Sequence, residues 1–101
     1  MTKALGGFDW DRGNARKCQK HGVSIAEIET LFDSGLLVLP DSAHSKAEPR
    51  QWGIGKTEAG RWVFVVFTIR VQARHRMIRP ISARYMHAKE VEAYEKENPG
   101  L

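Results

Sequence analysis

The sequence has a single cysteine, no long apolar run and no secretory leader pattern. Cys18 stands alone among the 101 residues, so no disulfide can form within the chain, and a reducing compartment is expected. No apolar run approaches the roughly 18 residues of a membrane-spanning helix, and the N-terminus lacks the charged and apolar regions of a signal peptide. These absences predict a cytoplasmic protein that makes no membrane contact.

Metal-ligating residues are also sparse. The four histidines lie far apart in the sequence, and only one thiol is available. Residues 41–48 form the densest group of ionisable side chains, but their spacing matches no standard zinc or two-metal signature. We therefore expect neither a metal nor another cofactor.

Acidic residues are scarce in the second half of the chain. Residues 1–48 carry six basic and seven acidic side chains, whereas residues 49–101 carry ten and five. The formal net charge of +4 therefore originates in the second half, where an anionic partner would bind. A solvated basic surface without a partner is the alternative interpretation.

Residues 61–84 contain six arginines and no acidic residue. Within the run 62–69 only Thr68 is polar, which predicts a central strand that is apolar on both faces. A second strand is predicted after a turn near residues 71–73, and Pro80 indicates an edge position or a bulge in it. Arginine binds phosphate through a planar fork of donors, so the segment favours a nucleic acid or another phosphate partner. The six are Arg61, Arg70, Arg74, Arg76, Arg79 and Arg84.

Two helices are predicted in the first half of the chain. Residues 8–11 resemble a short strand, and Asp11 can cap a helix over 12–21 that Gly22 ends, although Gly13 and Asn14 weaken its start. For the second helix, a capping box and a hydrophobic staple predict its start, and a glycine predicts its end. These signals are Ser24 with Glu27, Val23 with Ile28, and Gly35.

Strands and one further helix are predicted in the remainder. A short strand over 36–39 is expected to stop at Pro40, followed by a polar loop over 41–50. A strand over 51–56 and a turn over 57–60 lead into the arginine-rich strands. From residue 86 to about 98 the pattern is helical, with the glutamates on its water-facing side: Glu90, Glu92, Glu95 and Glu97.

This order predicts a single α+β domain over residues 1–101. Short turns between consecutive strands favour a mainly antiparallel sheet. The two helices of the N-terminal half are expected to pack on one face of that sheet, and the C-terminal helix follows the last strand. If the opposite face is only partly covered, it displays arginines from several strands.

Several phrases of the sequence, taken in order, resemble the BrnT toxins of type II toxin–antitoxin modules. The resemblance implies a RelE-like ribonuclease fold and a toxin that cleaves RNA and inhibits translation. It also implies a cognate BrnA-like antitoxin that silences the toxin, with DNA contacted only through that antitoxin. The phrases are Phe8-Asp9-Trp10-Asp11, Lys20-His21-Gly22-Val23-Ser24, Asp41-x-x-His44-Ser45-x-x-Glu48-x-Arg50, Ile54-Gly55, Gly60-Arg61 and Arg79-x-Ile81-Ser82-Ala83-Arg84.

Metal-free RNA cleavage needs a base for the 2′-hydroxyl proton, an acid for the leaving 5′-oxygen and fixed positive charge at the phosphate. His44 is the first candidate for proton transfer because imidazole titrates near neutral pH. Glu48 is its orienting partner or an alternative base. Four arginines are candidates for the charge: Arg50, Arg70, Arg79 and Arg84. Three more are expected to steer RNA rather than catalyse: Arg61, Arg74 and Arg76.

Each assignment has a structural alternative. A loop histidine such as His44 is commonly a capping or surface group, and Glu48 with Arg50 can simply form a salt bridge that holds the loop. At the level of function, a nucleic-acid-binding module without catalysis can use the same arginines to contact phosphates. A protein-interaction domain whose basic face meets an acidic partner helix is the third possibility.

Overall fold

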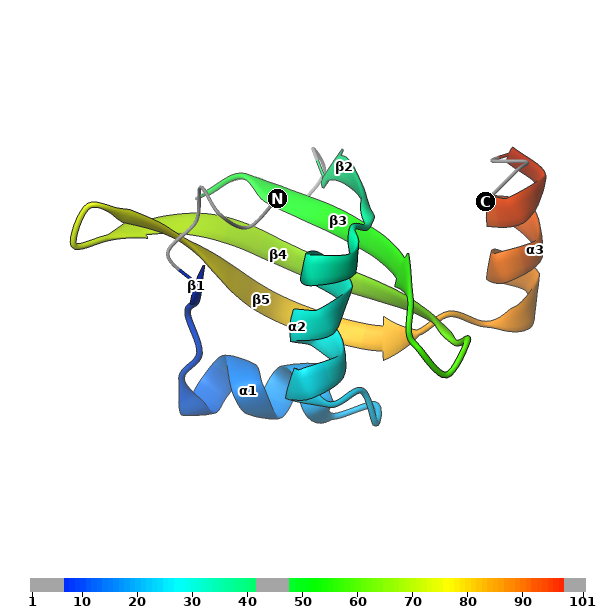
Figure 1. The fold of residues 1–101 in the computed structure, drawn as a ribbon, viewed down its shortest axis with the longest axis horizontal. Coiled ribbons are helices and arrows are strands. Elements are labelled where there is room, and N and C mark those ends of the chain that lie inside the picture. The colour runs from blue at the N-terminus through cyan, green and yellow to red at the C-terminus, as the bar shows by residue number, and fades with distance from the viewer. Residues whose placement is uncertain (1–6, 42–47, 98–101) are drawn as a thin grey trace.

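A computed structural model of the chain describes residues 7–41 and 48–97. These residues form a five-stranded sheet and three α-helices (Figure 1). The predicted order of strand, helix, helix, four strands and helix is confirmed. The elements are β1 (Gly7–Phe8), α1 (Arg12–Gln19), α2 (Ile25–Ser34), β2 (Leu37–Asp41), β3 (Arg50–Lys56), β4 (Trp62–Gln72), β5 (His75–Tyr85) and α3 (Ala88–Glu97).

The sheet has the strand order β1-β5-β4-β3-β2. Only the short β1 pairs in parallel, with β5, and the other pairs are antiparallel. The α+β class and the mainly antiparallel sheet are therefore confirmed, and β4 has the predicted central place. Ala73 and Arg74 join β4 to β5 with φ values of 48° and 69°, because a two-residue hairpin turn that matches the strand twist needs left-handed backbone.

A bulge interrupts the β4–β5 pairing beside Pro80, which is one of the two alternatives, an edge position or a bulge, that the sequence indicated. Ser82 lies opposite Val66 and Pro80 lies opposite Phe67, so Ile81 is an extra residue on β5. Proline lacks the N–H that a regular ladder uses, and a bulge removes one residue from the pairing at this point. The bulge re-aims the side chains on either side of it.

The prediction that Pro40 stops its strand is wrong. β2 runs through Pro40 to Asp41, and these two residues lie opposite Gln51 and Arg50 of β3. β2 is the edge strand of the sheet, so one side of it has no ladder partner and a residue without an N–H is tolerated. Asp41 is buried at the end of the pairing.

Asn14 strengthens the start of α1, contrary to the expectation that it weakens it. It forms a capping box with Asp11, and its side chain is buried. Its amide nitrogen donates to the carbonyl oxygen of Asp9 at 2.9 Å and to that of Pro80 at 2.8 Å. One side chain therefore starts the helix and attaches it to β5, the strand that α1 contacts most.

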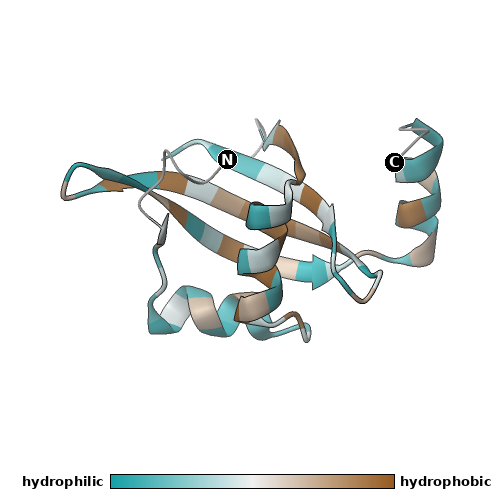
Figure 2. Ribbon diagram, viewed as in Figure 1, coloured by the Kyte–Doolittle hydropathy of each residue, from teal (hydrophilic) through white to brown (hydrophobic). Residues whose placement is uncertain are grey.

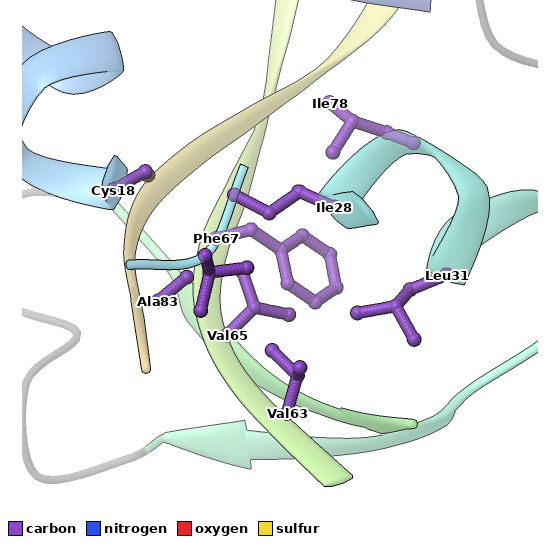
Figure 3. Packing of buried hydrophobic residues seen from close by; sticks show 9 residues of the cluster. Cys18, Ile28, Leu31, Val63, Val65, Phe67, Ile78 and Ala83 are labelled. Carbon is purple, nitrogen blue, oxygen red and sulfur yellow. The ribbon is translucent and has the colours of Figure 1, made fainter. Parts of the chain in front are cut away.

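The second helix begins and ends as the sequence indicates. Ser24 and Glu27 form the capping box, and Gly35 ends α2 with a φ of 92°. Figure 3 shows Ile28 and Leu31 of α2 pointing toward the ring of Phe67. The buried core consists of Cys18, Val23, Ile28, Leu31, Val63, Val65, Phe67, Ile78 and Ala83.

The other surface of the sheet, here called the outer face, points away from this core. Because side chains alternate along a strand, the residues between Val63, Val65 and Phe67 project to it, together with their partners across the sheet. Figure 2 shows hydrophobic residues along most of β4, whereas hydrophobic and hydrophilic residues are interspersed along β5. The outer face carries Arg50, Trp52 and Ile54 of β3, Phe64, Val66, Thr68 and Arg70 of β4, and Arg79, Ser82 and Arg84 of β5.

α3 stands beyond the strand ends and contributes no buried residue (Figure 1). Tyr94 of α3 meets the ring of Trp62 edge-on, with 5.1 Å between the ring centroids. None of the described helices has the length and apolar character needed to cross a bilayer.

Candidate functional site

Three of the four arginines predicted to act on phosphate surround one hollow on the outer face. Arg50 of β3, Arg70 of β4 and Arg79 of β5 line it together with Glu48, and its volume is about 290 Å³. Strand register brings them together, because Arg79 lies opposite Thr68 while Arg70 and Arg50 follow on the same face. We call this the arginine hollow. Its remaining lining residues are Gly13, Asn14, Lys17 and Ile81.

Glu48 is bound by Arg70 across the mouth of the hollow. Nη2 of Arg70 donates to Oε1 of Glu48 at 2.9 Å, and Nε donates to Oε2 at 3.3 Å. The hydrogen bond from Arg70 lowers the pKa of Glu48, and the nearby charges of Arg70, Arg79 and Arg50 act in the same direction. The carboxylate is therefore ionised at neutral pH. Both side chains are exposed, at 42% and 36%, so the pair adds little stability.

Arg79 is held more firmly than Arg70. Its Nη2 donates to Oδ2 of Asp11 at 2.8 Å, and its Nη1 lies 3.5 Å from Oδ2 of Asp9. Only 17% of the Arg79 side chain and 13% of the Asp9 side chain are exposed. The backbone N–H of Asn14, followed by Arg79, lowers the pKa of Asp11. The Arg79 guanidinium therefore has a fixed position in the wall of the hollow.

Arg84 lies outside the hollow. It is on the outer face too, but five residues beyond Arg79 on β5, which places the two Cα atoms roughly 15 Å apart. Its guanidinium donates to Oε1 and Oε2 of Glu90 at 2.7 and 2.8 Å, and it lies over the ring of Phe64. Glu90 was predicted to face water, and its side chain is 38% exposed although it pairs with Arg84. The hydrogen bonds from Arg84 and from the backbone of His87 lower the pKa of Glu90 to about 2.

The arginines predicted to steer RNA also lie away from the hollow. The Arg61 guanidinium stacks on the ring of Tyr85, 3.5 Å from its centroid. The hydroxyl of Tyr85 donates to Glu27 of α2, which places this group on the helix side of the sheet. Arg74 lies in the β4–β5 turn, and Arg76 is exposed on β5 next to it.

His44, the first candidate for proton transfer, lies outside the described residues. Its role stays a prediction from the sequence. The salt bridge predicted for Glu48 exists, but its partner is Arg70 of the neighbouring strand rather than Arg50. No group of three or more His, Cys, Asp or Glu side chains within 7–41 and 48–97 is placed to hold a metal ion.

Sequence reasoning missed Lys17 and Asp9. Lys17 adds a fourth cation to the lining of the hollow. Gly13, Asn14 and Lys17 share a helical face by their spacing, but nothing in the sequence indicates that this face borders the arginine strands. Asp9 was interpreted as part of a short strand and of a family-like phrase, without a site role. Its carbonyl oxygen accepts a hydrogen bond from Arg79, 70 positions away.

Comparison with known protein families adds an independent finding. The family model described as "Ribonuclease toxin, BrnT, of type II toxin-antitoxin system" matches residues 10–90. The match covers both early helices, the strands β2 to β5 and the whole lining of the arginine hollow. No curated protein matches the chain.

Proposed function

The chain belongs to the BrnT family of ribonuclease toxins of type II toxin–antitoxin systems, and from this premise we propose that the arginine hollow is its RNA-cleaving site. In this proposal the protein is a RelE-like, metal-independent endoribonuclease that inhibits translation in the cytoplasm. A cognate BrnA-like antitoxin neutralises it and makes the DNA contacts of the system.

One observation carries the proposal: four cations from three strands and a helix line one hollow of about 290 Å³. They are Lys17, Arg50, Arg70 and Arg79. A dianionic phosphorane is stabilised by donors that are already in place before the reaction, and removing one such donor typically slows an enzyme by roughly 100-fold. Arg79 meets this requirement because Asp9 and Asp11 hold it.

Arg70 is assigned the role of binding the substrate phosphate. Its exposed pairing with Glu48 is weak, so an incoming phosphate replaces the carboxylate and leaves Glu48 free beside the reacting atoms. In the proposed reaction the 2′-oxygen attacks phosphorus, a base takes the 2′-hydroxyl proton, and an acid gives a proton to the departing 5′-oxygen. Glu48 and His44 are assigned these two proton transfers. Arg84 is assigned a structural role, because it does not line the hollow and its guanidinium joins β5 to Glu90 of α3.

The test is cleavage of end-labelled RNA by the purified protein in the presence of EDTA. Wild-type protein is expected to cleave, and Arg70→Ala is expected to lower kcat/KM by about 100-fold. Lys96→Ala is the control, because it removes one positive charge from the exposed last turn of α3 and should leave the rate unchanged. His44→Ala and Glu48→Gln test the two proton-transfer assignments.

Two results would refute the proposal. If the wild-type protein binds RNA but does not cleave it, whether or not antitoxin is present, the protein is a binding module. An Arg70→Ala variant that is folded and cleaves at the wild-type rate indicates that the catalytic site lies elsewhere.

A further inference from the structure

A strip of aromatic and aliphatic side chains continues from the arginine hollow along the outer face. Trp52 follows Arg50 on β3 by two residues, so both side chains project to the same face with Cα atoms roughly 6.6 Å apart. Across the sheet, Trp52 lies opposite Leu39 of β2 and Val66 of β4. The Leu39 side chain is 39% exposed. The cationic hollow therefore adjoins an apolar floor with an indole at its centre.

The neighbouring rings of this strip already have partners. Lys56 and Tyr94 lie against Trp62, and the Arg84 guanidinium lies over Phe64. Trp52 meets Phe64 at a tilt of 58°, with 5.5 Å between the centroids. Among the described residues, no cation is stacked on Trp52. Its half-buried indole is thus the ring of the strip that lies next to the hollow, two residues from Arg50 on the same face.

We propose that Trp52 is a stacking platform for a nucleobase, and that the substrate of the arginine hollow is single-stranded RNA. This inference rests on the proposed function and names its substrate class. A nucleotide whose phosphate sits between Arg50 and Arg70 can place a neighbouring base on the indole only if that base is unstacked. Bases inside a duplex already stack on each other, so a double strand cannot use the platform.

Charge and stacking leave different signatures. Each phosphate contact to a single strand contributes about 0.7 to the slope of log K against log salt concentration, whereas stacking contributes no counterion release. Losing Trp52 should therefore weaken binding at every salt concentration without changing the slope. Losing Arg70 should reduce the slope by about 0.7.

The experiment measures the binding of 2′-O-methyl oligonucleotides, which lack the attacking hydroxyl, by fluorescence anisotropy. Trp52→Leu keeps apolar bulk but removes the ring, and Trp52→Phe keeps a ring. Trp52→Leu is expected to weaken single-strand binding by roughly tenfold or more, with partial recovery in Trp52→Phe and an unchanged salt slope. An oligonucleotide with abasic sites along its length should bind wild-type protein and Trp52→Leu equally. Thermal unfolding of both variants establishes that they are folded.

Failure of this inference is separable from failure of the proposed function. The inference would be overturned if folded Trp52→Leu bound the intact oligonucleotide with wild-type affinity. It would also be overturned if the wild-type protein bound duplex RNA as tightly as single-stranded RNA. Either result would indicate that the strip binds a protein partner instead. Either result can be obtained with a protein that still cleaves RNA, because the probe is not cleavable. The EDTA assay, which compares cleavage by wild-type protein and by Arg70→Ala, tests separately whether the arginine hollow is the cleavage site.

Discussion

Asn14 is expected to be the most sensitive polar position of the described chain, because it joins the helix start to the wall of the arginine hollow. Its side chain is 6% exposed and makes three hydrogen bonds: it accepts from the N–H of Asp11 and donates to the carbonyl oxygens of Asp9 and Pro80. Each such bond contributes about 1 kcal/mol net. Asn14→Ala should therefore lower the free energy of unfolding by roughly 3 kcal/mol.

The assay is thermal and urea unfolding followed by circular dichroism. For a chain of this length a loss of 1 kcal/mol lowers Tm by about 4–8 °C, so a fall of at least 12 °C is expected from about 3 kcal/mol. Asn14→Asp has nearly the same shape but points oxygen, not N–H, at the two carbonyl groups. It should be at least as unstable at pH 7 and recover partly at low pH, where the protonated carboxyl group donates one hydrogen bond.

Gln19→Ala is the matched control. Gln19 also donates from its side-chain amide to a backbone carbonyl oxygen of the same helix, that of Ala15, but at an exposed position. Its removal should change stability by less than about 0.5 kcal/mol. The reasoning would be refuted if Asn14→Ala lost less than about 1 kcal/mol, or if the two variants were equally destabilised.

Three further perturbations test the charges and the core. Arg79→Ala leaves the Asp9 carboxylate, 13% exposed, without its countercharge and should cost about 3 kcal/mol of stability in urea unfolding. Adding Asp9→Asn should restore most of this loss, and no restoration would contradict the pairing. Burial raises the pKa of Cys18 to about 11, so a thiol reagent should modify it only as fast as the protein unfolds; rapid modification of folded protein would show an accessible thiolate. Glu90→Gln should lower stability by about 0.5 kcal/mol at pH 7 through loss of the pair with Arg84. Because Arg84, followed by the backbone N–H of His87, lowers the pKa of Glu90 from 4.5 to about 2, these interactions contribute fully above pH 4.5 and are lost as the pH falls toward 2. The stability difference between wild type and variant should shrink over that range, and a constant difference would contradict this linkage.

The elements of the fold follow from local signals in the sequence. The Ser24–Glu27 capping box and Gly35 defined α2 because the hydrogen bonds and backbone angles involved span only a few neighbouring residues. The apolar run 62–69 indicated the central strand, because aromatic and β-branched side chains favour a strand that has a neighbour on each side in the sheet. Pro80 indicated the bulge because its missing N–H is a property of one residue.

Local signals misled where a distant partner changes the energy of a residue. Pro40 was expected to end a strand, but the edge position of β2 tolerates it. Asn14 was expected to weaken α1, but the carbonyl oxygen of Pro80, 66 positions away, accepts from its buried amide. Both outcomes depend on the sheet order, which a local pattern does not contain.

The sequence by itself determined the composition of the candidate site: a strand pair rich in arginine, without acidic residues of its own. Only the tertiary structure decided which arginines act together. Register and the bulge at Ile81 bring Arg50, Arg70 and Arg79 around one hollow and leave Arg84 with Glu90. A guanidinium group carries the same charge at every position along the chain, and the local pattern does not show which of these groups the fold places around one hollow.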